Sequence, residues 1–301
     1  MTVSTNLEAS PSAVASRVDE RPCLIVHGPD QPGIVAAVSS VLAAHGANIV
    51  ELDQHSDHTV GDALFLRTVF HVENYPAVRP GIEADLDRVL RGEFDLEWRL
   101  TDLATPKRVA IFASRSDHCL LDLLWRQRRG ELPMTVAMVI SNHTALADDV
   151  RGFGVPFVHI PVDSDDKPAA EAEQLRLLRG NVDLVILARY MQILSEDFLN
   201  DVGVPVINIH HSFLPAFIGA APYRKAWERG VKLIGATAHY VSTELDAGPI
   251  IEQDVIRVSH RDSVEELTRR GADVERQVLS RAVLWHCQDR VIRHANQTIV
   301  F

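Results

Sequence analysis

Cysteine is scarce in this chain, with only Cys23, Cys119 and Cys287 among 301 residues. An odd number of cysteines at such wide spacing matches neither a disulfide framework nor the short spacings of a zinc site. Disulfides are also rare in reducing compartments. We therefore expect three reduced thiols, no structural metal and a cytoplasmic protein.

Long apolar runs and an excess of positive charge are missing as well. No stretch reaches the roughly 18 apolar residues of a membrane-spanning helix, and residues 1–20 lack the basic start and apolar run of a signal peptide. With 30 Lys and Arg against 41 Asp and Glu, the formal net charge is −11, which opposes binding to nucleic acid or anionic membranes. We expect neither partner, and we interpret residues 1–20 as a disordered leader.

What remains is the composition of a globular protein, long enough for about two domains. Apolar patterning in residues 21–101 predicts strands at 23–27, 48–55, 63–72 and 94–100, and helices at 34–45 and 79–91. This βαββαβ order predicts a ferredoxin-like domain.

After a linker predicted at residues 102–107, strands alternate with helices over residues 108–301. The continuous apolar run at 184–187 is typical of a parallel strand covered on both faces. The alternation predicts a doubly wound, mostly parallel α/β domain. Ligands of such sheets bind beyond the carboxyl ends of the strands, which makes segments 189–194 and 208–211 candidate binding segments.

The polar cluster at the end of one predicted strand carries candidate chemistry. Strand alternation puts Asn208 and His210 on the same face, where an amide and an imidazole could stabilise an oxyanion. Asp246 lies in a tight loop after the next predicted strand. Taken singly, a buried histidine is more often structural, and an aspartate before glycine often only shapes a turn.

Together these residues resemble the folate-dependent formyltransferases over about residues 108–260. The shared motifs are Asn208-x-His210, Ser212-x-Leu214-Pro215, Gly219, Gly235-x-Thr237-x-His239 and Asp246-x-Gly248-Pro249-Ile250. The resemblance implies that Asn208, His210 and Asp246 are catalytic. It also implies a pterin-binding backbone loop at Met191, Gln192, Ile193 and Leu194, a second wall at Val241, Thr243 and Leu245, and substrate-side positions at Ser212, Gly219 and His239.

The turn at residues 113–119 bears on the formyl acceptor. Formyltransferases that use phosphoribosylglycinamide hold its phosphate in a glycine-rich turn, whereas this turn contains no glycine. We therefore expect the phosphate site to be lost and water to be the nucleophile.

Further segments, among them 116–120, 139–143, 187–194 and the doubled His210-His211, resemble the formyltetrahydrofolate deformylases. This similarity implies hydrolysis of 10-formyltetrahydrofolate to tetrahydrofolate and formate. It also implies no metal or permanently bound cofactor, and a role in one-carbon balance and purine biosynthesis.

The amino-terminal segments 30–34 and 47–49 resemble an ACT domain, a regulatory module that pairs and binds amino acids. The resemblance implies a ligand site at Asp30, Gln31, Gly33 and Asn48, glycine or methionine as effectors, and a homo-oligomer formed through these domains. Alternatively, the Pro and Gly residues only shape a turn and the domain only joins subunits.

Three other functions remain open from sequence alone. One is formyl transfer to an amine, and another is a non-catalytic amino-acid sensor. A third is metal-dependent hydrolysis by His210, His211, His239 and Asp246, although adjacent strand residues point to opposite faces.

Overall fold

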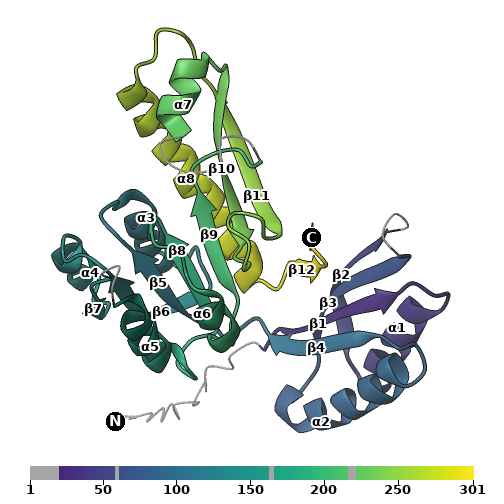
Figure 1. Cartoon of the computed structure of the whole chain (residues 1–301). Helices are drawn as coiled ribbons and strands as arrows, with labels where there is room; N and C mark the ends of the chain where they lie inside the picture. Colours follow the sequence, from purple (N-terminus) through teal and green to yellow (C-terminus); the bar gives the residue numbers. More distant parts are fainter. Residues whose placement is uncertain (1–19, 58–60, 163–165, 216–221) are drawn as a thin grey trace, which may run out of the picture.

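A computed structural model of the chain describes residues 20–57, 61–162, 166–215 and 222–301 (Figure 1). All of the predicted leader except residue 20 lies outside these ranges, and so does Gly219. None of the helices in the described ranges is long and apolar enough to cross a membrane.

The amino-terminal domain has the predicted βαββαβ order. Its elements are β1 (Pro22–Pro29), α1 (Ile34–Ala44), β2 (Asn48–Asp57), β3 (Ala63–His71), α2 (Tyr75–Leu86), continued by a π-helical turn (Asp87–Arg91), and β4 (Glu97–Asp102). The four strands form an antiparallel sheet in the order β2-β3-β1-β4. Helix α2 begins four residues before the predicted start, because a proline is tolerated in a first helical turn, here next to Tyr75.

Both faces of this sheet are covered. Alternation along β1 directs Leu24 and Val26 towards the core beneath α1 and α2, and Cys23 and Ile25 to the opposite face. That second face packs against Ile292 of the carboxy-terminal hairpin formed by β12 (Val291–His294) and β13 (Gln297–Val300). The end of the chain therefore returns to the first domain, as Figure 1 shows.

The second domain contains a seven-stranded sheet in the order β11-β10-β9-β8-β5-β6-β7. Its strands are β5 (Lys107–Ala113), β6 (Met134–Ser141), β7 (Phe157–His159), β8 (Leu184–Ala188), β9 (Val206–His210), β10 (Leu233–Tyr240) and β11 (Ile250–Arg257). Strands β5 to β9 run parallel, while β10 and β11 are antiparallel. The predicted mostly parallel α/β architecture is confirmed.

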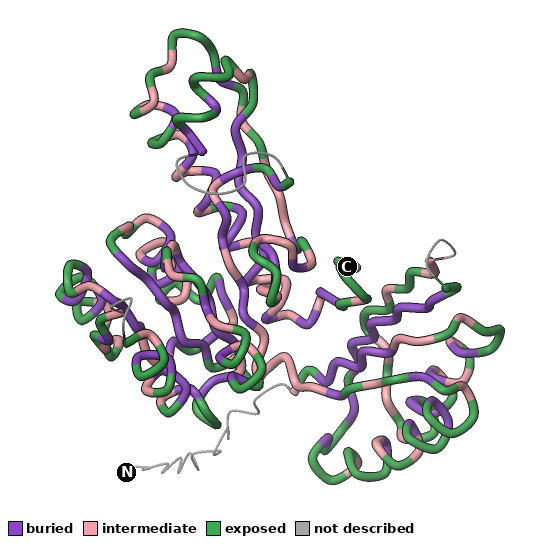
Figure 2. Tube along the Cα trace, viewed as in Figure 1, coloured by how far each residue is buried: buried purple, intermediate pink, exposed green. Residues whose placement is uncertain are grey.

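Six helices accompany this sheet in the described ranges. They are α3 (His118–Arg128), α4 (Ala147–Gly152), α5 (Lys167–Leu178), α6 (Glu196–Asp201), α7 (Pro222–Arg229) and α8 (Val264–Cys287). Apolar residues of α8 share one core with β5, β8, β9 and β10, whereas α5 and α6 pack in a separate cluster with other residues of β5 and β8. Figure 2 shows that buried residues gather along the strands of both sheets.

A buried carboxylate joins the two domains just beyond α8. Asp289 is 3% exposed and its oxygens lie 2.7 Å from Arg99 Nη1, 2.8 Å from the Thr101 hydroxyl and 3.2 Å from Lys107 Nζ. Burial opposes ionisation, yet the charges of Arg99 and Lys107 hold the pKa of Asp289 below its usual value. The junction is therefore ionic as well as apolar.

Candidate active site

Strand β9 brings Asn208 and His210 to the carboxyl edge of the parallel sheet. The intervening Ile207 and Ile209 point into the core beneath α8, so the two polar side chains share the opposite face. Strand β10 runs alongside, pairing His239 with Asn208 and Thr237 with His210. This is the edge at which ligands of doubly wound sheets bind.

The loop after β10 carries Asp246 back to His210. Asp246 has a left-handed backbone, with φ of 55°, a conformation that aspartate tolerates better than most residues. Its Oδ2 lies 3.2 Å from His210 Nδ1, and both side chains are less than 10% exposed. The hydrogen bond from His210 lowers the pKa of Asp246 although burial opposes this, so Asp246 is a carboxylate at neutral pH.

The other ring nitrogen of His210 is buried without a partner. Its Nε2 makes no hydrogen bond within the described part of the chain. Buried polar atoms are nearly always paired, so an orphaned atom needs an explanation. An Nε2 left free while Nδ1 is fixed by a carboxylate is the arrangement of a group that acts on a bound substrate.

His239 fixes the Asn208 amide. Its Nδ1 lies 2.9 Å from the carbonyl oxygen of Tyr240, an acceptor, so Nδ1 carries the proton. Burial lowers the pKa of His239, so the ring is neutral and Nε2 accepts. Asn208 Nδ2 donates to that Nε2 at 3.2 Å, which orients the amide.

The predicted pterin loop, residues 191–194, is held at both ends by α5. Before it, the Tyr190 hydroxyl accepts a hydrogen bond from Gln174 Nε2 at 2.9 Å. After it, the Ser195 amide and hydroxyl both donate to the Glu171 carboxylate, at 2.9 and 2.5 Å. The residues on both sides of the loop are therefore tethered to α5 at the sheet edge.

Apolar side chains are exposed on this loop and on the loop that carries Asp246. Met191 is 61%, Ile193 62% and Leu245 54% exposed. Leu194 and Val241 anchor the two loops in one apolar cluster. Uncovered apolar side chains beside polar groups are typical of a ligand-binding rim. The remaining predicted positions differ in exposure: Gln192 is half-buried, Thr243 exposed and Ser212 buried.

His210 and His211 have different partners in the structure. Their ring centroids lie 5.3 Å apart, and the His211 ring faces Tyr223, with centroids 6.0 Å apart. Burial lowers the pKa of His211 to about 4, so this ring is neutral. His210 instead pairs with Asp246. The two histidines therefore do not face a common metal position, as metal-dependent hydrolysis by both would require.

A buried glutamate that the sequence analysis did not single out lies near His211. Glu275 of α8 is 1% exposed, and its Oε2 lies 2.8 Å from His118 Nε2. Its Oε1 accepts a hydrogen bond from the Tyr223 hydroxyl at 2.5 Å. A sequence signal existed, because the apolar Val278 and Leu279 follow Glu275 at helical spacing and place it on the buried face of an amphipathic helix.

Donor atoms of His118, Cys119 and Glu275 come within 4.8 Å of one another, close enough to hold a metal ion. However, Arg189 Nη1 lies 3.5 Å from Glu275 Oε2. A guanidinium at this distance opposes a bound cation.

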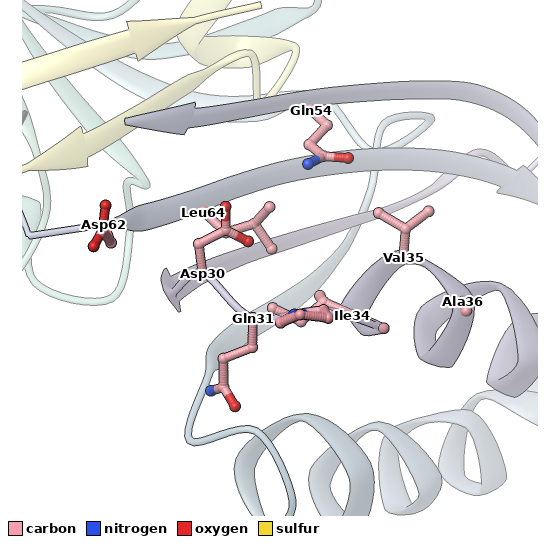
Figure 3. Close-up of a pocket in the computed structure, with 10 residues that line it drawn as sticks. Asp30, Gln31, Ile34, Val35, Ala36, Gln54, Asp62 and Leu64 are labelled. Carbon is pink, nitrogen blue, oxygen red and sulfur yellow. The ribbon is translucent and has the colours of Figure 1, made fainter. Parts of the chain in front are cut away.

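The first domain has a hollow of about 680 Å³ where β1 meets α1 (Figure 3). Asp30, Gln31 and Gly33 line it, as do Gln54 and Asp62. The fourth predicted effector residue, Asn48, is not among the lining residues. It begins β2 and pairs with His71, at the opposite end of the sheet from the pairing of Pro29 with Ala63. Within one chain, Asn48 therefore lies at the other end of the sheet from the hollow.

Comparison with known proteins agrees with this architecture. Residues 107–283 match the Formyl transferase family and residues 24–84 match the ACT domain. A formyltetrahydrofolate deformylase of Mycobacterium tuberculosis is 62% identical over 278 residues, 92% of this chain and 90% of that protein.

Solved structures give the same relationship. A formyltetrahydrofolate deformylase from Pseudomonas syringae pv. tomato has a TM-score of 0.90 at 48% identity, covering 95% of this chain and 96% of that one. A phosphoribosylglycinamide formyltransferase from Anaplasma phagocytophilum has a TM-score of 0.59 at 32% identity, covering 65% and 94%. The chain is an enzyme of the formyltetrahydrofolate deformylase family.

Proposed function

We propose that this enzyme hydrolyses 10-formyltetrahydrofolate to tetrahydrofolate and formate, with Asn208, His210 and Asp246 acting at the formyl carbon. Membership of the family supports the reaction. The observation that supports the residue roles is the buried His210–Asp246 pair beside an amide whose orientation is fixed.

In this mechanism water attacks the formyl carbon and negative charge develops on the formyl oxygen. His210, donating from Nε2 when protonated, and the Asn208 amide stabilise that oxyanion, each by about 3–4 kcal/mol. The Asp246 carboxylate accepts a proton from the attacking water, directly or through a second water. The C–N bond then breaks, and the folate nitrogen leaves with a proton.

We propose that the folate ring system binds at the exposed apolar rim between the two loops. The backbone of Met191, Gln192, Ile193 and Leu194 would form one side, and Val241, Thr243 and Leu245 the other. Ser212 and His239 would complete the substrate side. An apolar rim with few polar groups suits a flat aromatic ring.

We further propose that the first domain binds an amino-acid effector, with glycine and methionine as the first candidates, at the hollow lined by Asp30, Gln31 and Gly33. Pairing through β2 would supply Asn48 from a second chain. In support, β2 is an edge strand with Val50 60% and Leu52 40% exposed, and such edges can pair with a second chain.

We propose that the chain is divided into an amino-terminal domain at residues 21–101, a linker at 102–107 and a catalytic domain at 108–301. We also propose that the enzyme serves one-carbon balance and purine supply.

The reaction is tested by incubating the purified protein with 10-formyltetrahydrofolate and no amine. Formate and tetrahydrofolate should appear in equal amounts, with and without a chelator. Formyl transfer to an amine would instead require an added acceptor. Absence of formate under these conditions would refute the hydrolase proposal.

A further inference from the structure

The turn after β9, residues 211–214, is held by side chains rather than by strand pairing. Strand β9 ends at His210, and the pairing of His210 with Thr237 is the last one that joins β9 to β10 at this end. His210 is the residue proposed to act at the formyl oxygen, so the segment that leaves it bears on its position. Contacts other than the backbone ladder therefore fix this turn.

The Thr237 hydroxyl is the first of these contacts. Thr237 is 0% exposed. Its Oγ1 donates to the carbonyl oxygen of Ser212 at 2.9 Å and accepts a hydrogen bond from the amide of Leu214 at 3.0 Å. Gln253 Nε2 donates to the same oxygen at 2.9 Å. Because a hydroxyl has one donor and two acceptor positions, this group is fully satisfied and its direction is fixed.

Gln253 completes the network from the next strand, β11. Thr237 pairs with His210 on one side and with Gln253 on the other, and directly paired residues of antiparallel strands share a face. Gln253 Nε2 gives its second hydrogen to the carbonyl oxygen of Leu214, at 3.0 Å. Gln253 therefore binds Leu214 directly at its carbonyl group and, through Thr237, at its amide.

The surface of β10 also leaves room for this turn. A Cβ added at Gly235 would lie 3.3 Å from Phe213 Cβ and 2.4 Å from the carbonyl oxygen of Asp254. Because Gly235 has no side chain, the turn lies close against β10. This contact involves the part of β10 before Thr237, whereas the loop with Val241 and Asp246 follows the other end of the strand.

We propose that Gln253 is a positioning residue for the hydrolysis, because it fixes the turn after β9 and thereby keeps His210 in place against Asp246 and the formyl carbon. This inference rests on the proposed hydrolase function. His210 Nδ1 lies 3.2 Å from Asp246 Oδ2, and a displacement of about 1 Å at a reacting group can cost about 100-fold in rate. The proposed ring-binding rim lies on other loops, so a loosened turn should lower kcat and leave KM nearly unchanged.

The test replaces Gln253 by Met, which keeps the length of the side chain and removes both donated hydrogens. We expect kcat for formate release to fall by about tenfold, while KM changes by less than about twofold. Asp254→Asn is the matched control. It alters the neighbouring side chain of β11, whose Oδ2 lies 2.8 Å from Arg281 Nη2, and it should keep the wild-type kcat and KM.

A double-mutant cycle with Thr237→Val tests whether Gln253 acts through the hydroxyl. The combined variant should lose less in kcat than the product of the two single losses, because residues of one hydrogen-bond network are coupled. Thermal unfolding of each variant establishes that the assayed protein is folded. A combined loss equal to the product would overturn the proposed route through Thr237.

A wild-type kcat in Gln253→Met, or a rise in KM alone, would overturn the inference. If Gln253→Met does not fold, Gln253→Glu replaces it, since it keeps the shape and, when ionised, has no hydrogen to donate. Hydrogen exchange of the Leu214 amide, measured without substrate, should be faster in the variant, and equal exchange would also overturn the inference. A wild type that releases no formate would refute the proposed function instead, while the exchange measurement would still report on Gln253.

Discussion

Replacing His239 tests whether the orientation of the Asn208 amide matters for catalysis. Phenylalanine at position 239 removes the acceptor that holds Asn208 Nδ2 at 3.2 Å and the donor to the Tyr240 carbonyl. A net hydrogen bond contributes about 0.5–1.5 kcal/mol, which corresponds to a loss of about two- to tenfold in kcat/KM. Glutamine can offer an oxygen near the position of Nε2 and should lose less.

The assay is the initial rate of formate release at pH 7, because burial lowers the pKa of His239 and keeps the ring neutral there. Thermal unfolding separates folding from orientation, since both variants leave the Tyr240 carbonyl without its donor. Equal kcat/KM in the wild type and His239→Phe would show that His239 does not orient the Asn208 amide for catalysis. A phenylalanine variant more active than the glutamine variant would do so too.

Three further predictions concern the scaffold. Gly271→Ala should destabilise the protein by about 1–3 kcal/mol in urea unfolding, because the new Cβ would overlap a tyrosine hydroxyl; Gly152→Ala, with open space, should change stability by less than about 0.5 kcal/mol. Asp289→Ala should cost about 1–3 kcal/mol. Because the pKa of Asp289 in the folded protein is lowered from 3.8, its stabilising contribution should be complete above pH 3.8 and disappear as the pH falls through the folded pKa. A wild-type urea midpoint for Asp289→Ala at neutral pH would contradict this. Burial raises the pKa of Cys23 and Cys287 to about 12, so a thiol reagent should modify them only after unfolding, and rapid labelling of native protein would contradict that.

The fold was predictable because local patterns agree with the tertiary structure. The short apolar run of β1 and the continuous apolar run of β8 both match strands that are buried on two faces. The start of α2 and the carboxy-terminal hairpin were less accessible. Prolines obscure the first turn of α2, and the hairpin is stabilised by contacts with Cys23 and Ile25, nearly the whole chain length away.

The site was predictable in part, for a similar reason. Asn208 and His210 lie two residues apart on one strand, so alternation alone puts them on one face. Nothing local predicts that the β10 loop returns Asp246 to within 3.2 Å of His210; the family resemblance supplied that expectation. Glu275 lies 65 residues after the end of β9, so its helical spacing indicates burial but only the tertiary structure brings it to His118 and Tyr223.

In the proposed mechanism, Asn208 and His210 stabilise charge on the formyl oxygen. Single-turnover formate release by Asn208→Ala and by His210→Ala tests it most directly, with His159→Ala as control, since His159 is exposed on the last strand of the sheet. We expect losses of about 100-fold or more in each of the first two and none in the control. Near wild-type rates in both would contradict it.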